Sequence, residues 1–277
     1  MKALLRKVLA WLFLPLAWLT NRLRPGVRVL MYHRIDDLPE YDQLTVGPAL
    51  FRQQMAWLSR HRRVVPLSQA LTELASGTVR PDTVVVTFDD GYRDNLTHAL
   101  PVLKEFGLPA TVFITTGFAG GSIQHPRYAP TEALHMHWDD MADWLGHQGN
   151  EIGAHSRTHP YLSQLDERAC ADEIGGCLED FSEHQVSHNA VFCYPSGDMT
   201  TREANLARQA GYSAAVTVAP GINRPGEDPY FIKRTEITDR DQLPEFRLKL
   251  SGAFDFIHAL LHWRRKRNFA RAAAGHA

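Results

Sequence analysis

Short apolar runs rich in β-branched residues alternate, along the centre of the chain, with stretches whose apolar residues recur every three or four positions. The apolar runs predict seven strands, over residues 27–35, 83–90, 110–116, 151–155, 190–194, 212–218 and 230–237. The amphipathic stretches predict helices between them, including residues 166–182 and 201–210. Apolar strands that alternate with helices indicate a parallel sheet covered on both faces. Seven such units favour closure into a barrel, and no long linker divides the chain, so we expect one catalytic α/β domain over residues 27–245.

Shared apolar faces indicate two further helices. One face is made by Phe51, Met55 and Leu58 and the other by Leu96, Leu100 and Leu103. Residues 117–137 form the longest irregular segment, which we expect to overhang a site at the sheet edge.

The net charge of -1, from 30 Lys and Arg against 31 Asp and Glu, conceals an uneven distribution. Residues 1–28 carry six positive side chains and no acid, and residues 246–277 carry seven and one. The centre holds 17 positive and 30 acidic residues, a net charge of -13. The ends are therefore expected to act differently from the centre. The 44% hydrophobic content excludes a disordered chain, and the three cysteines form no disulfide framework.

The N-terminal end, residues 1–26, predicts a membrane anchor or interfacial helix. Its uncharged stretch between Lys7 and Arg22 would cover about 21 Å as a helix, against roughly 30 Å of hydrocarbon, and Pro15 interrupts it. Trp11 and Trp18 suit a membrane interface. A cleaved signal peptide and a helix packed on the domain remain open alternatives.

The C-terminal end, residues 246–277, predicts a basic amphipathic helix. Its apolar face and the basic cluster at residues 264–267, which follows Trp263, suit an anionic membrane surface. The apolar face is made by Phe254, Ile257, Leu260 and Leu261. The alternative is a last helix that closes the fold and ends in a solvated tail.

Two carboxylates, Asp89 and Asp90, end the second predicted strand. The carboxyl ends of strands are where α/β proteins build their sites. Neighbouring side chains diverge on a strand, so one carboxylate can bind a metal while the other acts as a base. An acidic turn is the alternative, because Asp-Asp-Gly suits turns.

Three other features also follow strands. His155 and His159 lie four positions apart and can converge on one ion. The Pro-Ser-Gly turn at residues 195–197 can expose backbone N–H groups that hold an oxyanion. His33 follows the first strand and is a candidate acid. Each feature taken alone is equally compatible with a structural role.

Taken together, these motifs resemble the NodB-homology polysaccharide deacetylases, carbohydrate esterase family 4. Thr-Phe-Asp-Asp-Gly at 87–91 and His-Ser-Arg-Thr-His at 155–159 are complete versions of that family's two most specific motifs. The likeness covers about residues 27–240. The leading VLMYHRI and the FCYPSG sequence resemble the branch that contains the poly-N-acetylglucosamine deacetylases, in which the motifs are permuted.

The resemblance implies a distorted (β/α) barrel that holds a divalent metal, usually zinc. It implies Asp90, His155 and His159 as metal ligands and Asp89 as the general base acting on the metal-bound water. One carboxylate and two imidazoles leave positions open for water and substrate, which fits that chemistry. The oxyanion would meet the metal and the backbone N–H of Ser196.

Two departures from the commoner family pattern concern the acid and the residue that orients the base. The leaving amine needs a proton, and likeness to the permuted branch implies His33 as its donor. Cys193 stands where the commoner third motif has an Arg that orients the base. Arg234, from another strand, is a possible replacement.

The implied function is removal of an N-acetyl group from a sugar of a cell-envelope polysaccharide or a lipid-linked saccharide. We expect an N-acetylated saccharide as substrate, membrane contact through both ends and no nucleic-acid partner. The expected location is a bacterial inner membrane, on a side that the sequence leaves open.

Two alternatives use the same residues. A two-His-one-carboxylate iron oxygenase shares the ligand set, but it is usually built on a jelly roll with closely spaced ligands, whereas 65 positions separate Asp90 from His155. A glycan-binding relative without catalysis should lose the base or a ligand, and this chain keeps all four residues.

Overall fold

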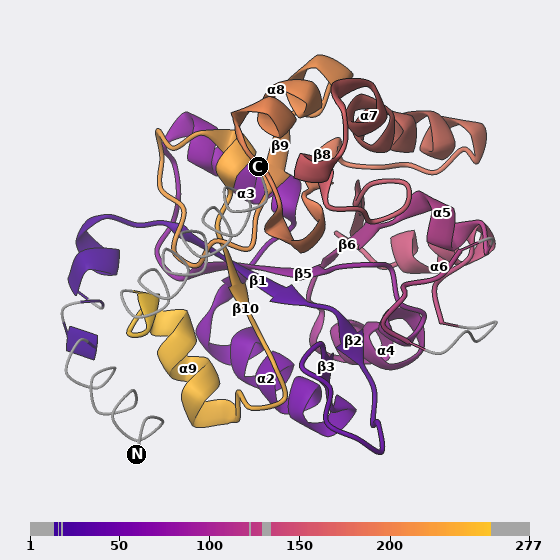
Figure 1. The fold of residues 1–277 in the computed structure, drawn as a ribbon. Helices are drawn as coiled ribbons and strands as arrows, with labels where there is room; N and C mark the ends of the chain where they lie inside the picture. Colours follow the sequence, from indigo (N-terminus) through magenta and orange to yellow (C-terminus); the bar gives the residue numbers. More distant parts are fainter. Residues whose placement is uncertain (1–13, 16, 18, 122, 129–133, 256–277) are drawn as a thin grey trace, which may run out of the picture.

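Seven parallel strands form a nearly closed barrel in the computed structural model, which describes residues 14–255 except 16, 18, 122 and 129–133 (Figure 1). The strand order is β10-β1-β5-β6-β7-β8-β9. The strands are β1 (Val27–Tyr32), β5 (Thr83–Phe88), β6 (Thr111–Ile114), β7 (Glu151–Ala154), β8 (Val191–Cys193), β9 (Ala214–Val216) and β10 (Arg234–Glu236). Each lies within one of the seven predicted runs, so the predicted barrel of parallel strands is confirmed.

The first and last strands of this order, β10 and β9, approach each other through the residues that precede β10. Val216 forms a parallel bridge with Ile232, and the N–H of Thr217 donates to the carbonyl of Ile232 at 2.8 Å. A few backbone hydrogen bonds between β9 and the residues before β10 therefore bring the barrel close to closure. By contrast with this short contact, β1 and β5 pair along their whole length, from Val27 with Thr83 to Tyr32 with Phe88.

Three strands have two residues each: β3 (Thr45–Val46) and β4 (Arg63–Val64) were not predicted, and the predicted strand 27–35 is divided into β1 and the short β2 (Arg34–Ile35). β4 pairs with β5 beside the main path, and β2 pairs with β3 in a separate sheet. Two residues are too few for a period-2 pattern to be recognised in sequence.

Helices cover the barrel, and their ends follow local sequence signals. They are α2 (Pro48–His61), α3 (Leu67–Ser76), α4 (Leu100–Phe106), α5 (Thr116–Ala119), α6 (Met141–Leu145), α7 (Glu167–Glu183), α8 (Thr201–Ala210) and α9 (Leu243–Ser251). The two helices predicted at 166–182 and 201–210 are α7 and α8. Thr200 and Glu203 form a capping box at the start of α8, and Gly211 ends it with φ 102°.

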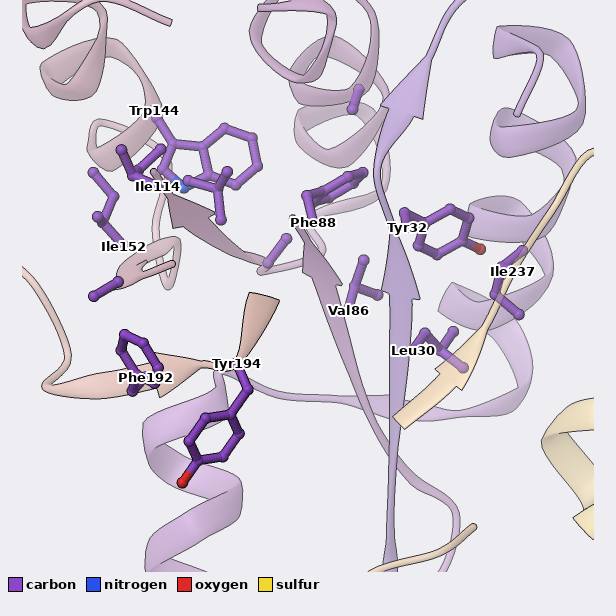
Figure 2. Close-up of a cluster of buried hydrophobic side chains, with 14 of the residues drawn as sticks. Leu30, Tyr32, Val86, Phe88, Ile114, Trp144, Ile152, Phe192, Tyr194 and Ile237 are labelled. Carbon is purple, nitrogen blue, oxygen red and sulfur yellow. The ribbon is translucent and has the colours of Figure 1, made fainter. Parts of the chain in front are cut away.

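Alternate residues of the strands point to two different apolar clusters. Leu30, Tyr32, Val86 and Phe88 belong to the cluster that the strands share with α2, α4 and α6 (Figure 2). Val85, by contrast, belongs to the second cluster. The second cluster joins side chains from several strands, including Val27, Val29, Phe113, Cys193 and Val216, with residues of α3. The period of two therefore separates a helix-facing set from a barrel-facing set, and Asp89 continues the barrel-facing series of Val85 and Thr87.

The described parts of the two chain ends pack against each other. Leu14 contacts a cluster made by Leu248, Ala253 and Phe254, and the buried Arg28 forms an ion pair with Asp255 at 2.8 Å. Within the described residues, no helix is long and apolar enough to cross a membrane. Most of the predicted anchor and of the basic C-terminal helix lies outside the described residues, so their membrane role stays a prediction.

Candidate active site

Asp89 lies at the carboxyl end of β5 and is almost completely buried. Its two carboxylate oxygens accept hydrogen bonds from the guanidinium of Arg234, at 2.6 and 2.8 Å. Burial favours the neutral acid, but the charge and hydrogen bonds of Arg234 outweigh it and lower the pKa of Asp89. Asp89 is therefore ionised at neutral pH. The structure thus places Arg234 where the interpretation as a base-orienting residue requires it.

Asp90 adopts a left-handed backbone conformation, with φ 67°, directly after Asp89. Its side chain is buried, and its Oδ1 atom has no hydrogen-bond partner in the described chain. Oδ1 instead lies 3.3 Å from Nε2 of His155 and 3.5 Å from Nε2 of His159. The two adjacent carboxylates consequently have separate surroundings, as the strand geometry predicts.

His155 follows β7 and is fixed by a hydrogen bond of its second ring nitrogen. Nδ1 lies 2.8 Å from the carbonyl oxygen of Cys193, an acceptor, so Nδ1 carries the hydrogen and Nε2 of the neutral ring presents a lone pair. That lone pair faces the Oδ1 atom of Asp90. Two acceptors at this distance repel each other unless a cation lies between them. Burial lowers the pKa of His155, and the interactions with Cys193, Asp90 and Asp89 raise the pKa by more, so a positive charge between Nε2 and Asp90 is favoured, carried either by a proton on Nε2 or by a metal ion.

His159 lies at the end of a tightly turned loop. Its backbone has φ 60°, that of Ser156 has φ 62°, and the N–H of His159 donates to Oγ of Ser156 at 3.0 Å. Burial lowers the pKa of His159 to about 4, so the ring is neutral and able to bind a metal at neutral pH. Left-handed conformations at non-glycine residues are strained, and their clustering here is typical of a functional site.

Two groups of side chains in the described chain could hold a metal ion: Asp90 with His155 and His159, and Asp89 with His155 and Cys193. The first group is the better site. In the second, Arg234 occupies both oxygens of Asp89 and lies 3.1 Å from Sγ of Cys193, so a cation there would face a guanidinium. Burial raises the pKa of Cys193, which keeps the thiol protonated.

His33 and Ser196 both lie at the carboxyl ends of their strands. Nε2 of His33 is 3.9 Å from Oδ2 of Asp89. Ser196 lies in a turn at Pro195–Gly197, with φ 55°, after β8. In the described chain, its backbone N–H donates no hydrogen bond to a neighbouring group, so it remains free for a ligand oxygen. The structure brings His33 to the base and leaves Ser196 as a possible donor.

Sequence reasoning missed two histidines in the segment predicted to overhang the site. The ring of His125 packs against that of His159, with centroids 5.2 Å apart. The Nδ1 atom of His135 lies 3.1 Å from the backbone oxygen of Asp90. Burial lowers the pKa of His135 to about 4 and also lowers that of His125, so both rings are neutral. Neither residue has a spacing signal, because only the fold brings His125 to the loop after β7 and His135 to the loop after β5.

The sequence profile of the polysaccharide deacetylase family matches residues 76–215. Among curated proteins, YxkH of Bacillus subtilis, whose name places it with the polysaccharide deacetylases, is 27% identical over 224 residues, covering 80% of this chain and 75% of that protein. The poly-β-1,6-N-acetyl-D-glucosamine N-deacetylase of Staphylococcus aureus is 22% identical over 203 residues, covering 72% and 70%.

Solved structures of other proteins share the fold of this chain. IcaB from Ammonifex degensii superposes with a TM-score of 0.68 at 27% identity, covering 82% of this chain and 97% of IcaB. The deacetylase PplD of Streptococcus pyogenes superposes with a TM-score of 0.73 at 20% identity, covering 82% and 99%, which shows a shared fold.

Proposed function

Since the chain belongs to the polysaccharide deacetylase family, we propose that it is a metal-dependent hydrolase that removes an N-acetyl group from a sugar. The observation that carries this proposal is the convergence of two separate carboxylate environments at one end of the barrel. The side chain of Asp90 faces the imidazoles of His155 and His159. The side chain of the preceding residue, Asp89, is paired with Arg234. A metal site and an ionised base therefore stand side by side.

The residues present fit a divalent metal. The buried, unpartnered oxygen of Asp90 and the Nε2 atoms of His155 and His159 are a carboxylate and two imidazoles, a donor set that zinc accepts. We propose that these three residues hold the ion and that the ion is Zn²⁺. When bound, it would polarise the acetamide carbonyl and lower the pKa of the attacking water.

Asp89 and His33 carry out the two proton transfers, and Arg234 and Ser196 support them. Asp89 takes one proton from the water that attacks the carbonyl carbon, and Arg234 keeps the carboxylate oriented and ionised. The N–H of Ser196 donates to the developing oxyanion. His33, in its imidazolium form, gives a proton to the nitrogen as the carbon–nitrogen bond breaks. Acetate and a free amine leave, Asp89 releases the proton that it took from the water to solvent, and His33 takes up a proton from solvent to replace the one that it gave.

The proposed substrate is an N-acetylated sugar of a cell-envelope polysaccharide or of a lipid-linked saccharide. The Staphylococcus aureus relative, which is named for poly-β-1,6-N-acetyl-D-glucosamine, supports a polymer of N-acetylglucosamine as the first substrate to test. The basic and apolar ends of the chain support a location at a membrane surface, for which we propose the bacterial inner membrane.

Acetate release from β-1,6-linked N-acetylglucosamine oligomers tests the proposal. We expect release by the purified protein, its loss after chelation, its recovery with Zn²⁺, and no release by Asp89→Asn. Oligomer binding without acetate release from any N-acetylated sugar would instead identify a glycan-binding relative. An iron oxygenase is not favoured, because the parallel α/β barrel is not the jelly roll usual for that site.

A further inference from the structure

A cleft of about 870 Å³ lies at the end of the barrel opposite to the candidate active site. It is bounded by described residues of the N-terminal end, by the last part of α2 and by α9 along its length, and Asp82, one of its lining residues, immediately precedes β5. Asp89 and Asp90 follow the same strand. In Figure 1 the described residues of the N-terminal end lie at the side from which β1 starts, away from its arrowhead.

The cleft has a cationic part built around Trp57. The guanidinium carbon of Arg62 lies 4.8 Å from the centroid of the indole ring, and that of Arg247 lies 5.7 Å from it. Arg22 also lines the cleft, and Asp82 is the one acid among the described lining residues. Asp82 is 3.4 Å from Arg62. The guanidinium groups of Arg62 and Arg247 face the single carboxylate of Asp82, so positive charge is in excess around Trp57.

The effect of this excess is visible on Arg62. Burial lowers the pKa of Arg62, and the nearby charges of Arg28 and Arg247 lower it further, against the opposing effect of Asp82. An anion between Arg62 and Arg247 would therefore be stabilised by both guanidinium groups.

The rest of the cleft is mainly apolar. The lining side chains of this kind are Leu14, Pro15, Pro81, Pro244, Leu248 and Leu250. The volume falls within the range of roughly 300–1,000 Å³ usual for small-molecule sites. An occupant with a charged head and an apolar tail would satisfy both parts, whereas a free anion would leave the apolar part unused.

We propose that this cleft binds an anionic phospholipid, with the phosphate between Arg62 and Arg247 and an acyl chain along the leucines and prolines. Charge complementarity between Arg62, Arg247 and a phosphate supports this occupant, and so does the composition of residues 1–28, which carry six positive side chains and no acid. A barrel held in this way presents its active end away from the bilayer. The lipid site is independent of the proposed chemistry.

Titration of the full-length protein with monomeric lipids tests the site. The probes are dihexanoyl-phosphatidylglycerol, dihexanoyl-phosphatidylcholine and inorganic phosphate, followed by calorimetry below the micelle concentration. We expect the phosphatidylglycerol to bind at least tenfold more tightly than either other probe. Equal binding of the two lipids, equal binding of phosphate, or no binding of the phosphatidylglycerol would overturn the proposal.

Variants then locate the binding. Arg62→Gln with Arg247→Gln should weaken phosphatidylglycerol binding at least tenfold while acetate release is retained, which also reports that the variant is folded. Arg60→Gln is the matched control, because Arg60 lies exposed on the same helix and does not line the cleft. An equal loss in the control variant would show a general charge effect and refute the site. If the double variant does not fold, Leu14→Asn, which changes the apolar part of the cleft at a partly exposed position, should produce the same loss.

Discussion

The guanidinium of Arg234 on β10 donates to both carboxylate oxygens of Asp89, the residue after β5, at 2.6 and 2.8 Å, although β1 lies between the two strands. Both side chains are almost fully buried. A bidentate pair of this kind fixes the orientation of the carboxylate as well as its charge. Removing one partner of a buried pair typically costs about 3–5 kcal/mol, because the remaining charge has lost its partner. Arg234 therefore determines how Asp89 is presented to a reacting water.

Arg234→Gln should move the acid limb of the pH profile of kcat/KM to higher pH. Arg234 lowers the pKa of Asp89, so its removal raises that pKa, and the ionised base is then lost at a higher pH. Arg28→Gln is the control, since Arg28 is also buried and bidentate, with Asp255 at 2.8 and 2.9 Å. The control should lose thermal stability and keep the acid limb. An unchanged limb in Arg234→Gln would mean that Arg234 does not tune the base.

Asp90→Asn and Asp89→Asn should separate metal binding from catalysis. Asp90 faces two imidazoles, so its variant should lose bound metal, measured by elemental analysis after dialysis. Asp89 is paired with Arg234, so its variant should keep the metal while kcat falls by about 10²–10⁴, the range for a lost general base. Loss of metal from Asp89→Asn alone would reverse the two assignments.

Most of the strands were predictable from sequence because each lies in a continuous apolar run that ends in polar residues, whereas β10, with the sequence Arg-Thr-Glu, was predicted only as part of the longer stretch 230–237. Leu30, Val86 and Val112, for example, are buried on parallel strands with helices above them, so no polar alternation interrupts the pattern. The two-residue strands β3 and β4 carry no such run, and β2 was predicted only as the end of the first one. They depend on pairing partners such as Thr83, which pairs with Arg63 across the fold.

The candidate site was predictable only in part. Asp89, Asp90, His155 and His159 occur in compact motifs that follow strands, and the parallel sheet brings these strand ends together. Arg234 was only a possibility in sequence, because a lone Arg within a strand has no spacing that links it to Asp89 over 145 positions. His125 and His135 come from a long irregular segment whose path depends on tertiary packing.

His33→Gln should affect amide hydrolysis far more than ester hydrolysis. An amine must be protonated as it leaves, whereas a phenolate leaves without an acid. We therefore expect acetate release from N-acetylglucosamine oligomers to fall about 10²–10⁴-fold, while hydrolysis of an aryl acetate stays within a few fold of the wild type. The comparison uses kcat for both substrates with the metal content of the variant matched to the wild type. Parallel losses on amide and ester would remove His33 from the role of acid and leave it a structural neighbour of Asp89.

Glu173 on α7 holds the loop that connects the two histidines. One of its oxygens accepts from the backbone N–H groups of Arg157 and Thr158, both at 2.9 Å, and the other accepts from Oγ1 of Thr158 at 2.6 Å. Three hydrogen bonds from one carboxylate fix the backbone between His155 and His159 without touching either ring. Partners of this kind orient metal ligands, and their loss typically weakens metal binding about 10–100-fold.

Glu173→Ala should therefore weaken Zn²⁺ binding by about 10–100-fold, measured by competition with a chromogenic chelator. Glu179→Ala is the matched control on the same helix, because Glu179 contacts only the side chain of Arg157 in this loop, at 3.3 Å, and is 72% exposed. An exposed ion pair of that length contributes at most about 1 kcal/mol, so the control should bind Zn²⁺ as the wild type does. Addition of Zn²⁺ in excess should restore acetate release to Glu173→Ala, because its three proposed ligands remain in place. Failure of excess Zn²⁺ to restore activity, with affinity unchanged, would show that the loop positions the substrate and not the metal.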